Sequence, residues 1–166
     1  MKDFRNVPGH LYEAEGIYLQ EIAADKVVLE IGTHHGKSTA ALASTAKHVT
    51  TLDNYLGDSM IGAPNKSDTI SNLRGYHNIA LLETDWKTWP LQPDRYDLIF
   101  YDGDHSQEKE FLKHLVNYPG DIILHDYKLN EPAFSHVVKA VRWFADLTGR
   151  SFILPTGSLA HFEKQS

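Results

Sequence analysis

Acids and glycines recur at five places along the chain, each directly after a short, mostly apolar run. The first place holds Glu30, Gly32 and Gly36 within the stretch EIGTHHGKS. The other four places each hold an acid, and these are Asp53, Asp85, Asp102 and Asp126. In open α/β sheets, ligands bind beyond the carboxyl ends of the strands. If the apolar runs are parallel strands, these carboxylates line one site, where they could bind hydroxyl, amino or ammonium groups or a cation.

The elements that must position these residues alternate in type along the chain. The apolar pattern predicts buried strands over 26–31, 48–52, 79–83, 96–101 and 121–125. It predicts helices over 11–24, 38–46, 106–117 and 134–147. Gly149 is expected to cap the last helix, and residues 53–78 to form a loop with a short helix. The segments 152–154 and 159–162 flank Gly157 as in a β-hairpin. Such alternation implies βαβ units in a mostly parallel sheet with one antiparallel edge.

Composition excludes several classes of protein. The 166 residues, with 42% hydrophobic and 23% charged, predict a single globular domain over residues 1–166. No apolar run approaches the roughly 18 residues of a membrane span, and no signal-peptide pattern opens the chain. The absence of cysteine excludes a disulfide framework and a cysteine zinc site and is consistent with a cytoplasmic location. The net charge of −6 argues against a nucleic-acid partner.

The glycine turn after the first strand admits several interpretations. A phosphate-binding P-loop needs four residues between its first glycine and the Gly-Lys-Ser, whereas only three separate Gly32 from Gly36. A dinucleotide-binding turn needs a middle glycine, and Thr33 and His34 leave no place for it. A tight strand-to-helix turn without a ligand also stays open. The remaining interpretation is an acid two residues before a G-x-x-x-G turn, in which bare backbone lets a nucleoside and an amino acid approach closely.

With that turn in place, the chain resembles the class I S-adenosylmethionine-dependent methyltransferases, in particular a small O-methyltransferase-like branch. The motifs that carry the resemblance are EIGTHHGKS and YDGDHS, followed by ILHDY. The resemblance runs from about Glu30 to the terminal hairpin. It implies a Rossmann-like three-layer sandwich, which here would have a mostly parallel seven-stranded sheet with a C-terminal antiparallel hairpin. It also implies S-adenosylmethionine as cofactor and transfer of its methyl group to an unidentified acceptor, with oxygen as the expected atom.

The resemblance assigns cofactor roles to residues at the strand ends. Asp53 would accept both ribose hydroxyls, Asp85 would accept from the adenine amino group, and Trp86 would either stack on that ring or belong to the core. The full set expected to bind the cofactor is Glu30, Gly32, Thr33, Gly36, Ser38, Asp53, Asp85 and Asp102.

Some relatives hold a divalent cation with the acid after the fourth strand and a pair of acidic or amide residues after the fifth. Asp102 and Asp126 match two of these positions, so they are the expected metal ligands. His125 stands where a carboxylate is usual. Magnesium prefers hard oxygen ligands, and a softer ion would tolerate His125 better. The alternative is that Asp102 binds the cofactor's ammonium group and Asp126 caps the next segment.

A hydroxyl acceptor must lose a proton, and a histidine suits that task near neutral pH. His105 is the first candidate for this catalytic base, followed by His125 and Lys128. The acceptor is expected to contact residues 54–78, the first helix and the loop 128–132. Without a large lid insertion, the site is either open or completed by a second subunit of a homo-oligomer. Two alternatives to an active methyltransferase stay open: a cofactor-binding subunit without catalysis, and a nucleotide-dependent oxidoreductase.

Overall fold

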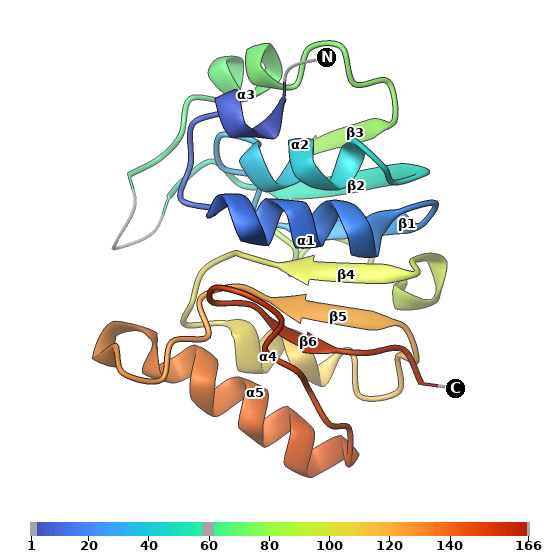
Figure 1. The fold of residues 1–166 in the computed structure, drawn as a ribbon, viewed down its shortest axis with the longest axis vertical. Helices are drawn as coiled ribbons and strands as arrows, with labels where there is room; N and C mark the ends of the chain where they lie inside the picture. Colours follow the sequence, from blue (N-terminus) through green and yellow to red (C-terminus); the bar gives the residue numbers. More distant parts are fainter. Residues whose placement is uncertain (1–2, 58–61, 166) are drawn as a thin grey trace.

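The computed structural model describes residues 3–57 and 62–165 of the chain. Its centre is a six-stranded sheet of order β3-β2-β1-β4-β5-β6 (Figure 1). The strands are β1 (Val27–Ile31), β2 (His48–Asp53), β3 (Ile79–Glu83), β4 (Leu98–Tyr101), β5 (Asp121–Leu124) and β6 (Ala160–Phe162). The first five are parallel and β6 runs antiparallel to β5. The expected parallel sheet with an antiparallel end strand is therefore confirmed.

Helices cover both faces of the sheet. They are α1 (Glu13–Ala23), α2 (Lys37–Ala43), α3 (Lys66–Asn72), α4 (Glu108–Lys113) and α5 (Ser135–Thr148), with 3-10 turns at Phe4–Asn6, Pro93–Arg95 and Pro132–Phe134. Side chains alternate along β1, so Val28 packs with α1 and α2 while Leu29 and Ile31 pack with α4 and α5. These two apolar clusters hold the three layers together. The α5 helix ends at Gly149, as expected, with a φ of 70°.

The expected seventh strand is the one part of the sheet that the structure corrects. Within the described residues, the segment 152–154 forms only a single bridge, between Ile153 and His161. Pro155 follows this segment at once and has no N–H with which to extend a ladder. The terminal hairpin therefore contributes one strand, β6, and an isolated bridge.

The strand order places a ligand site between β1 and β4. The chain proceeds from β1 to β2 on one side and returns to β4 on the other, so the loops after β1 and β4 diverge at this point. Gly32 lets the first residues of these two loops touch before the loops diverge. A Cβ atom at Gly32 would lie 2.1 Å from the backbone oxygen of Asp102, and the φ of Gly32 is +95°. No helix among the described residues is both long and apolar enough to cross a membrane.

Candidate functional site

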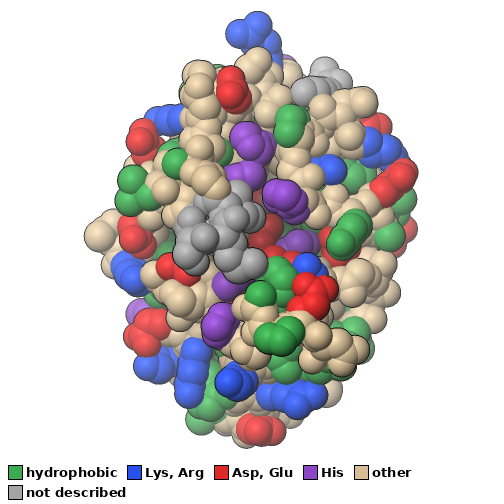
Figure 2. Space-filling view, turned by 90° about the vertical axis from the view of Figure 1, so that its left-hand side faces the viewer, with side chains coloured by type: hydrophobic (Ala, Val, Ile, Leu, Met, Phe, Trp, Pro, Cys, Tyr) green, Lys and Arg blue, Asp and Glu red, His purple; other side chains and the backbone are tan. Residues whose placement is uncertain are grey.

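A cleft opens over the carboxyl ends of β1 to β5, as the sequence predicts. Figure 2 shows histidine side chains gathered along a hollowed face of the molecule, with acidic side chains deeper between them. The predicted site residues that line the cleft are Gly32, Thr33, Ser38, Asp53, Asp85, Asp102, His105 and Asp126. The structure therefore brings together most of the residues that the sequence singles out.

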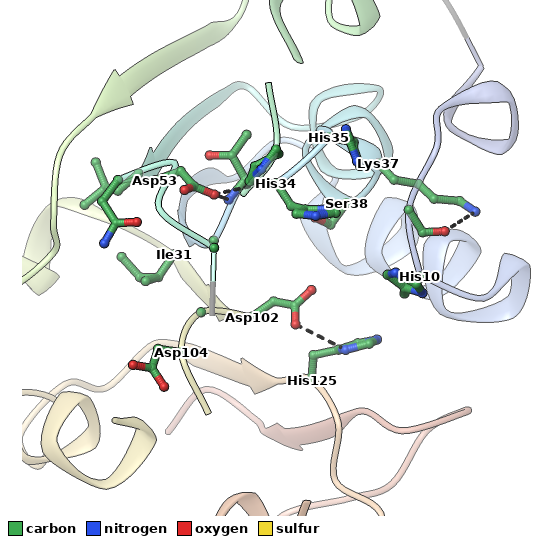
Figure 3. Close-up of a pocket in the computed structure, with 18 of the residues that line it drawn as sticks. His10, Ile31, His34, His35, Lys37, Ser38, Asp53, Asp102, Asp104 and His125 are labelled. Atoms are coloured by element: carbon green, nitrogen blue, oxygen red, sulfur yellow. Dashed lines mark hydrogen bonds and ion pairs between the residues drawn. The ribbon is translucent and has the colours of Figure 1, made fainter. Parts of the chain in front are cut away.

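Asp53 shapes the glycine turn of this cleft. One of its carboxylate oxygens accepts the backbone N–H groups of Thr33 at 2.9 Å and His34 at 2.7 Å. The other oxygen accepts the backbone N–H of Tyr55 at 2.6 Å. His34 adopts a φ of 47°, which this double contact helps to stabilise. The end of β2 thus fixes the turn after β1, and the Asp53 carboxylate stands at the cleft wall (Figure 3).

Two residues expected at the cofactor do not line the cleft. Glu30 is completely buried, and the hydroxyl of Thr39 donates to its Oε2 at 2.5 Å. Burial raises the pKa of Glu30 to about 7. Gly36 precedes α2 in a left-handed conformation, and a Cβ atom there would lie 3.0 Å from the side chain of Leu73. In this structure Glu30 and Gly36 therefore support the glycine turn after β1 through contacts outside the cleft.

The end of β3 supplies the far wall of the cleft. Asp85 lines it, and its Oδ1 accepts the backbone N–H of Lys87 at 2.9 Å. Trp86 is largely buried, with its ring edge-on to Phe111 at a centroid distance of 5.2 Å, yet it also lines the cleft. The Trp86 ring can therefore pack in the core and still contact a ligand in the cleft.

Asp126, just beyond β5, is surrounded by cationic side chains. Its Oδ2 lies 3.1 Å from Nε2 of His105 and 3.3 Å from Nδ1 of His125. Its Oδ1 lies 3.0 Å from Nζ of Lys128. Although burial alone would raise it, the contacts of His105 and His125 lower the pKa of Asp126 well below its usual range. The backbone of Asp126 has a φ of 60°, a strained conformation that is often found at functional sites.

His125 joins the ends of β4 and β5 to α1. Its Nδ1 lies 3.3 Å from Oδ1 of Asp102, and the two side chains face each other across the cleft floor (Figure 3). Its Nε2 lies 3.1 Å from Oε2 of Glu15, a fully buried carboxylate of α1. Although burial alone would lower it, Asp102, Asp126 and Glu15 raise the pKa of His125 well above its usual value.

His105 also has a carboxylate at each ring nitrogen. Nε2 faces Asp126 at 3.1 Å and Nδ1 faces Glu108 at 3.0 Å. Although burial alone would lower it, these two contacts raise the pKa of His105 to about 10. At neutral pH, His105 therefore carries both protons and has no lone pair with which to accept a third. The role of His105 as a base stays a prediction, and it requires the small deprotonated fraction of this ring.

Sequence reasoning missed Glu15 and Glu108, two buried carboxylates that contact the histidines of the site without lining the cleft. Glu108 lies three residues after His105 and could have been found from that helical spacing. Glu15 stands in the first turn of α1 and accepts the backbone N–H of Tyr12 at 2.9 Å, which is an ordinary helix-capping pattern. Nothing in the sequence connects it with His125, because the two are 110 residues apart.

The two metal ligands expected from the sequence, Asp102 and Asp126, lie close together, and His105 joins them. Asp102, His105 and Asp126 each present one ligand atom, and these atoms lie within 4.8 Å of one another. Two features make this a poor fit for magnesium. The set offers only two carboxylates beside an imidazole, whereas magnesium prefers oxygen ligands. Moreover, Nδ1 of His125 lies within 3.3 Å of both carboxylates, at the position where a further carboxylate or amide oxygen would be expected.

A second hollow adjoins the cleft beyond Asp126. The two share seven lining residues: Gly9, His10, Leu11, Lys37, His105, His125 and Asp126. The second is completed by Tyr12, Lys128 and Phe134, where Nζ of Lys128 lies 4.1 Å from the centre of the Phe134 ring. It has both apolar and charged walls, and a molecule bound there would adjoin the cleft at Asp126.

The chain matches a family model in sequence and solved structures in fold. Residues 29–127 match the family model described as a methyltransferase domain. A comparison of the sequence with curated proteins found no match.

Solved structures share the fold at low sequence identity. An O-methyltransferase from Bacillus cereus, in complex with SAH, is 18% identical with a TM-score of 0.66, over 96% of this chain and 86% of that one. The O-methyltransferase TomG from Streptomyces achromogenes, in complex with SAM, is 16% identical with a TM-score of 0.65, over 95% and 82%. The tRNA (m1A58) methyltransferase TrmI from Aquifex aeolicus is 15% identical with a TM-score of 0.69, over 96% and 71%. At these identities the likeness concerns the fold alone.

Proposed function

Because the chain belongs to the methyltransferase-domain family, we propose that it is an S-adenosylmethionine-dependent methyltransferase that acts on an oxygen atom of its acceptor, with residues 1–166 as one functional domain. One observation carries this proposal. The cleft places Asp53 at a bare glycine turn, with Asp85 along one wall and Asp102 on the floor. Two of the structural neighbours, those from Bacillus cereus and Streptomyces achromogenes, were solved with SAH or SAM and support the choice of cofactor.

In this proposal, each wall of the cleft binds one part of the cofactor. Three backbone N–H groups already donate to the Asp53 carboxylate, so one lone pair of Oδ1 remains, and it accepts one ribose hydroxyl. Asp85 accepts from the adenine amino group, and Trp86 contacts the ring with its exposed edge. Asp102 binds the ammonium group of the methionine portion, while Thr33 and Ser38 line the turn beside it.

The residues around Asp126 would receive the acceptor in the adjoining hollow. The bound cofactor supplies an activated methyl group, so the main task of the protein is alignment, which can contribute about 7–11 kcal/mol. The apolar wall formed by Leu11, Tyr12 and Phe134 would hold the body of the acceptor. The Asp126 carboxylate, kept ionised by its cationic neighbours, would accept the hydrogen bond of the acceptor hydroxyl. The hollow is bordered by Leu11 and Tyr12, at the start of the first expected helix, and by Lys128 of the 128–132 loop, which are two of the segments expected to contact the acceptor. Residues 58–61 of the third expected segment, 54–78, lie outside the described residues.

If His105 is the base, the rate must follow its deprotonated fraction. Because the pKa of His105 is raised to about 10, the turnover should rise through pH 8 and 9. A rate that is flat over that range would remove the base role and leave His105 as an anchor for Asp126.

The proposal is tested by calorimetric titration of S-adenosylhomocysteine into the protein in the presence of a chelator, with a nicotinamide dinucleotide as the competing ligand. We expect micromolar binding of the first and no binding of the second. Asp53→Asn should weaken binding at least about tenfold, because each lost charged hydrogen bond costs about 1.5–3 kcal/mol. The exposed Asp146→Asn on α5 is the matched control and should bind as the parent does.

Three results would contradict the proposal in different ways. No binding by a folded sample would end the assignment of the cofactor. Binding of the nicotinamide ligand alone would favour the oxidoreductase. Tight binding without turnover on a broad panel of hydroxyl acceptors would favour a cofactor-binding subunit.

A further inference from the structure

Lys37 directly follows the glycine turn, and the proposed function gives it no role. Its side chain lines both the cleft and the adjoining hollow, as does that of His10. The acids that would bind the cofactor line the cleft alone, and these are Asp53, Asp85 and Asp102. Figure 3 shows Lys37 and His10 on the opposite side of the cleft from Asp53. Lys37 therefore stands where the cofactor part of the site meets the acceptor part.

Lys37 differs from the other half-buried lysines in its partners. Four lysines of the described chain are half-buried, and these are Lys26, Lys37, Lys66 and Lys128. The other three each have a carboxylate oxygen within 3.0 Å of Nζ. Within residues 3–57 and 62–165, no carboxylate oxygen lies within 4.0 Å of Nζ of Lys37. No side chain in this part of the chain thus neutralises its positive charge.

The segment before α1 holds Lys37 in this place. Nζ of Lys37 donates to the backbone oxygen of Gly9 at 3.3 Å. Gly9 allows the close approach, because a Cβ atom there would lie 3.1 Å from Cβ of Lys37, and its φ of +140° disfavours other residues. An ammonium group has three N–H donors, and this carbonyl accepts only one of them. Two donors of Lys37 remain for a ligand.

The adjoining hollow combines this positive charge with an apolar wall. The wall consists of Leu11, Tyr12 and Phe134. Asp126 is the only acid among the described residues that line the hollow, and it already contacts Lys128. One unpaired ammonium group balances a single negative charge, and its attraction is stronger beside apolar groups than in water. A carboxylate carries that charge at neutral pH, whereas a phosphate group carries up to about two charges.

We propose that Lys37 binds a carboxylate of the acceptor, so that the substrate class is an apolar hydroxy acid with its body against Phe134 and its hydroxyl at Asp126. His10 lines the same hollow and offers the carboxylate a further N–H donor. Lys37 determines specificity: it anchors the acceptor, and the carboxylate that it binds is not methylated. This inference rests on the proposed function, which places the acceptor hydroxyl.

The first test measures binding of acceptor analogues and needs no turnover. 4-Hydroxybenzoate and 4-hydroxyphenylacetate are titrated into the intact chain by calorimetry, each beside its neutral amide of similar shape. At least one acid should bind at least about tenfold more tightly than its amide, because the amide lacks the charge that strengthens the contact with Lys37. The absence of such a preference would overturn the proposal. Tighter binding of 4-hydroxyphenyl phosphate than of either acid would overturn the choice of a carboxylate.

Substitutions then locate the group that recognises the acid. Lys37→Met keeps the length of the side chain and removes its charge, so the preference should fall below about threefold while the amide binds as before. Lys37→Arg keeps the charge and should retain most of the preference. Lys139→Met, at an exposed lysine of α5, is the matched control and should bind as the parent does. A full preference in folded Lys37→Met, or its loss in both Lys37 variants, would overturn the assignment.

The methionine portion of the cofactor carries another carboxylate that could reach Lys37. S-Adenosylhomocysteine contains this carboxylate and 5′-methylthioadenosine does not, so both are titrated into the parent and Lys37→Met. Each should bind the two proteins alike. A loss of at least about tenfold for S-adenosylhomocysteine alone would assign Lys37 to the cofactor and overturn the proposal.

The same titrations separate this inference from the proposed function. If S-adenosylhomocysteine fails to bind the parent while the preference for the acid depends on Lys37, the proposed function fails and the carboxylate site stands. If S-adenosylhomocysteine binds and neither acid is preferred, only this inference fails.

Discussion

The two ends of β5 carry similar groups in different settings. At its beginning, Oδ1 of Asp121 lies 3.0 Å from Nε2 of His161, and Oδ2 lies 2.7 Å from Nζ of Lys26. The backbone N–H of Lys164 also donates to Oδ1 at 2.9 Å, and Nδ1 of His161 lies 2.6 Å from the hydroxyl of Tyr18. Asp121 is 4% exposed, so this end is closed by the chain itself.

Beyond the other end, Asp126 likewise contacts a lysine and two histidines, but it borders both the cleft and the adjoining hollow. The difference teaches that an Asp–His–Lys cluster does not by itself mark a functional site. At the amino ends of the strands, neighbouring backbone closes over the cluster. At the carboxyl ends the loops diverge at the change in strand order, and the same groups stay reachable by a ligand.

The largest expected effect is a loss of turnover when Asp126, beyond the open end of β5, is substituted. Asp126→Asn keeps the size of the side chain and removes its charge, so turnover should fall about 10³-fold, the upper range for loss of one oriented electrostatic contact. Steady-state kinetics under saturating cofactor would measure it. A fall of less than threefold in a folded variant would show that Asp126 does not face the acceptor.

The matched change at the closed end should affect stability instead. Asp121→Asn leaves Lys26 and buried His161 without their carboxylate, which should cost about 3 kcal/mol of unfolding free energy. Turnover of the folded protein should be unchanged. Urea unfolding and kinetics on the same sample would test both statements, and a loss of turnover equal to that of Asp126→Asn would erase the distinction between the ends.

The stability that Asp121 contributes should depend on pH in a definite direction. Although burial alone would raise it, His161 and Lys26 lower the pKa of Asp121 from its usual 3.8. A depressed pKa gives stability that is present above pH 4 and lost as the pH falls further. The difference between the parent and Asp121→Asn should therefore shrink below pH 4, as acid unfolding curves would show.

Glu30 adds a third case to the comparison of Asp121 with Asp126, because its carboxylate is buried without a cationic partner. Its Oε1 has no hydrogen-bond partner, and burial raises its pKa from 4.5 to about 7. The folded state therefore holds the proton more tightly, so stability present below pH 4.5 should fall as the pH rises to 7. In Glu30→Gln, the decline in unfolding free energy between pH 5 and pH 8 should be smaller by about 2 kcal/mol. Urea unfolding at pH 5 and pH 8 measures it, and parallel curves for the two proteins would refute it.

The smallest effect concerns the wall of the cleft farthest from β5. Asp85→Ala should weaken S-adenosylhomocysteine binding about fivefold, because one hydrogen bond is worth about 1 kcal/mol. Calorimetry would measure this change, with no change expected in unfolding free energy. An unaltered affinity would reduce Asp85 to a turn residue that accepts the N–H of Lys87.

Much of the fold could be predicted because its signals are local. Apolar runs and helical spacing located every strand from β1 to β5 and the helices α1, α2, α4 and α5 to within a few residues at most boundaries. The error at 152–154 arose because a short apolar run does not reveal whether its backbone will find a partner. Pro155 limits that pairing to a single bridge.

The sequence by itself determined the edge of the sheet at which the chemistry lies, since residues that follow parallel strands must meet there. It placed Asp53, Asp85, Asp102 and Asp126 around one cleft. Only the tertiary structure decided which groups carry protons and which support the turn from within the core. Burial of Glu30 and the contact of Glu15 with His125 depend on segments far apart in the chain. Protonation follows from the surrounding charges and solvent, and neither is encoded in the spacing of residues.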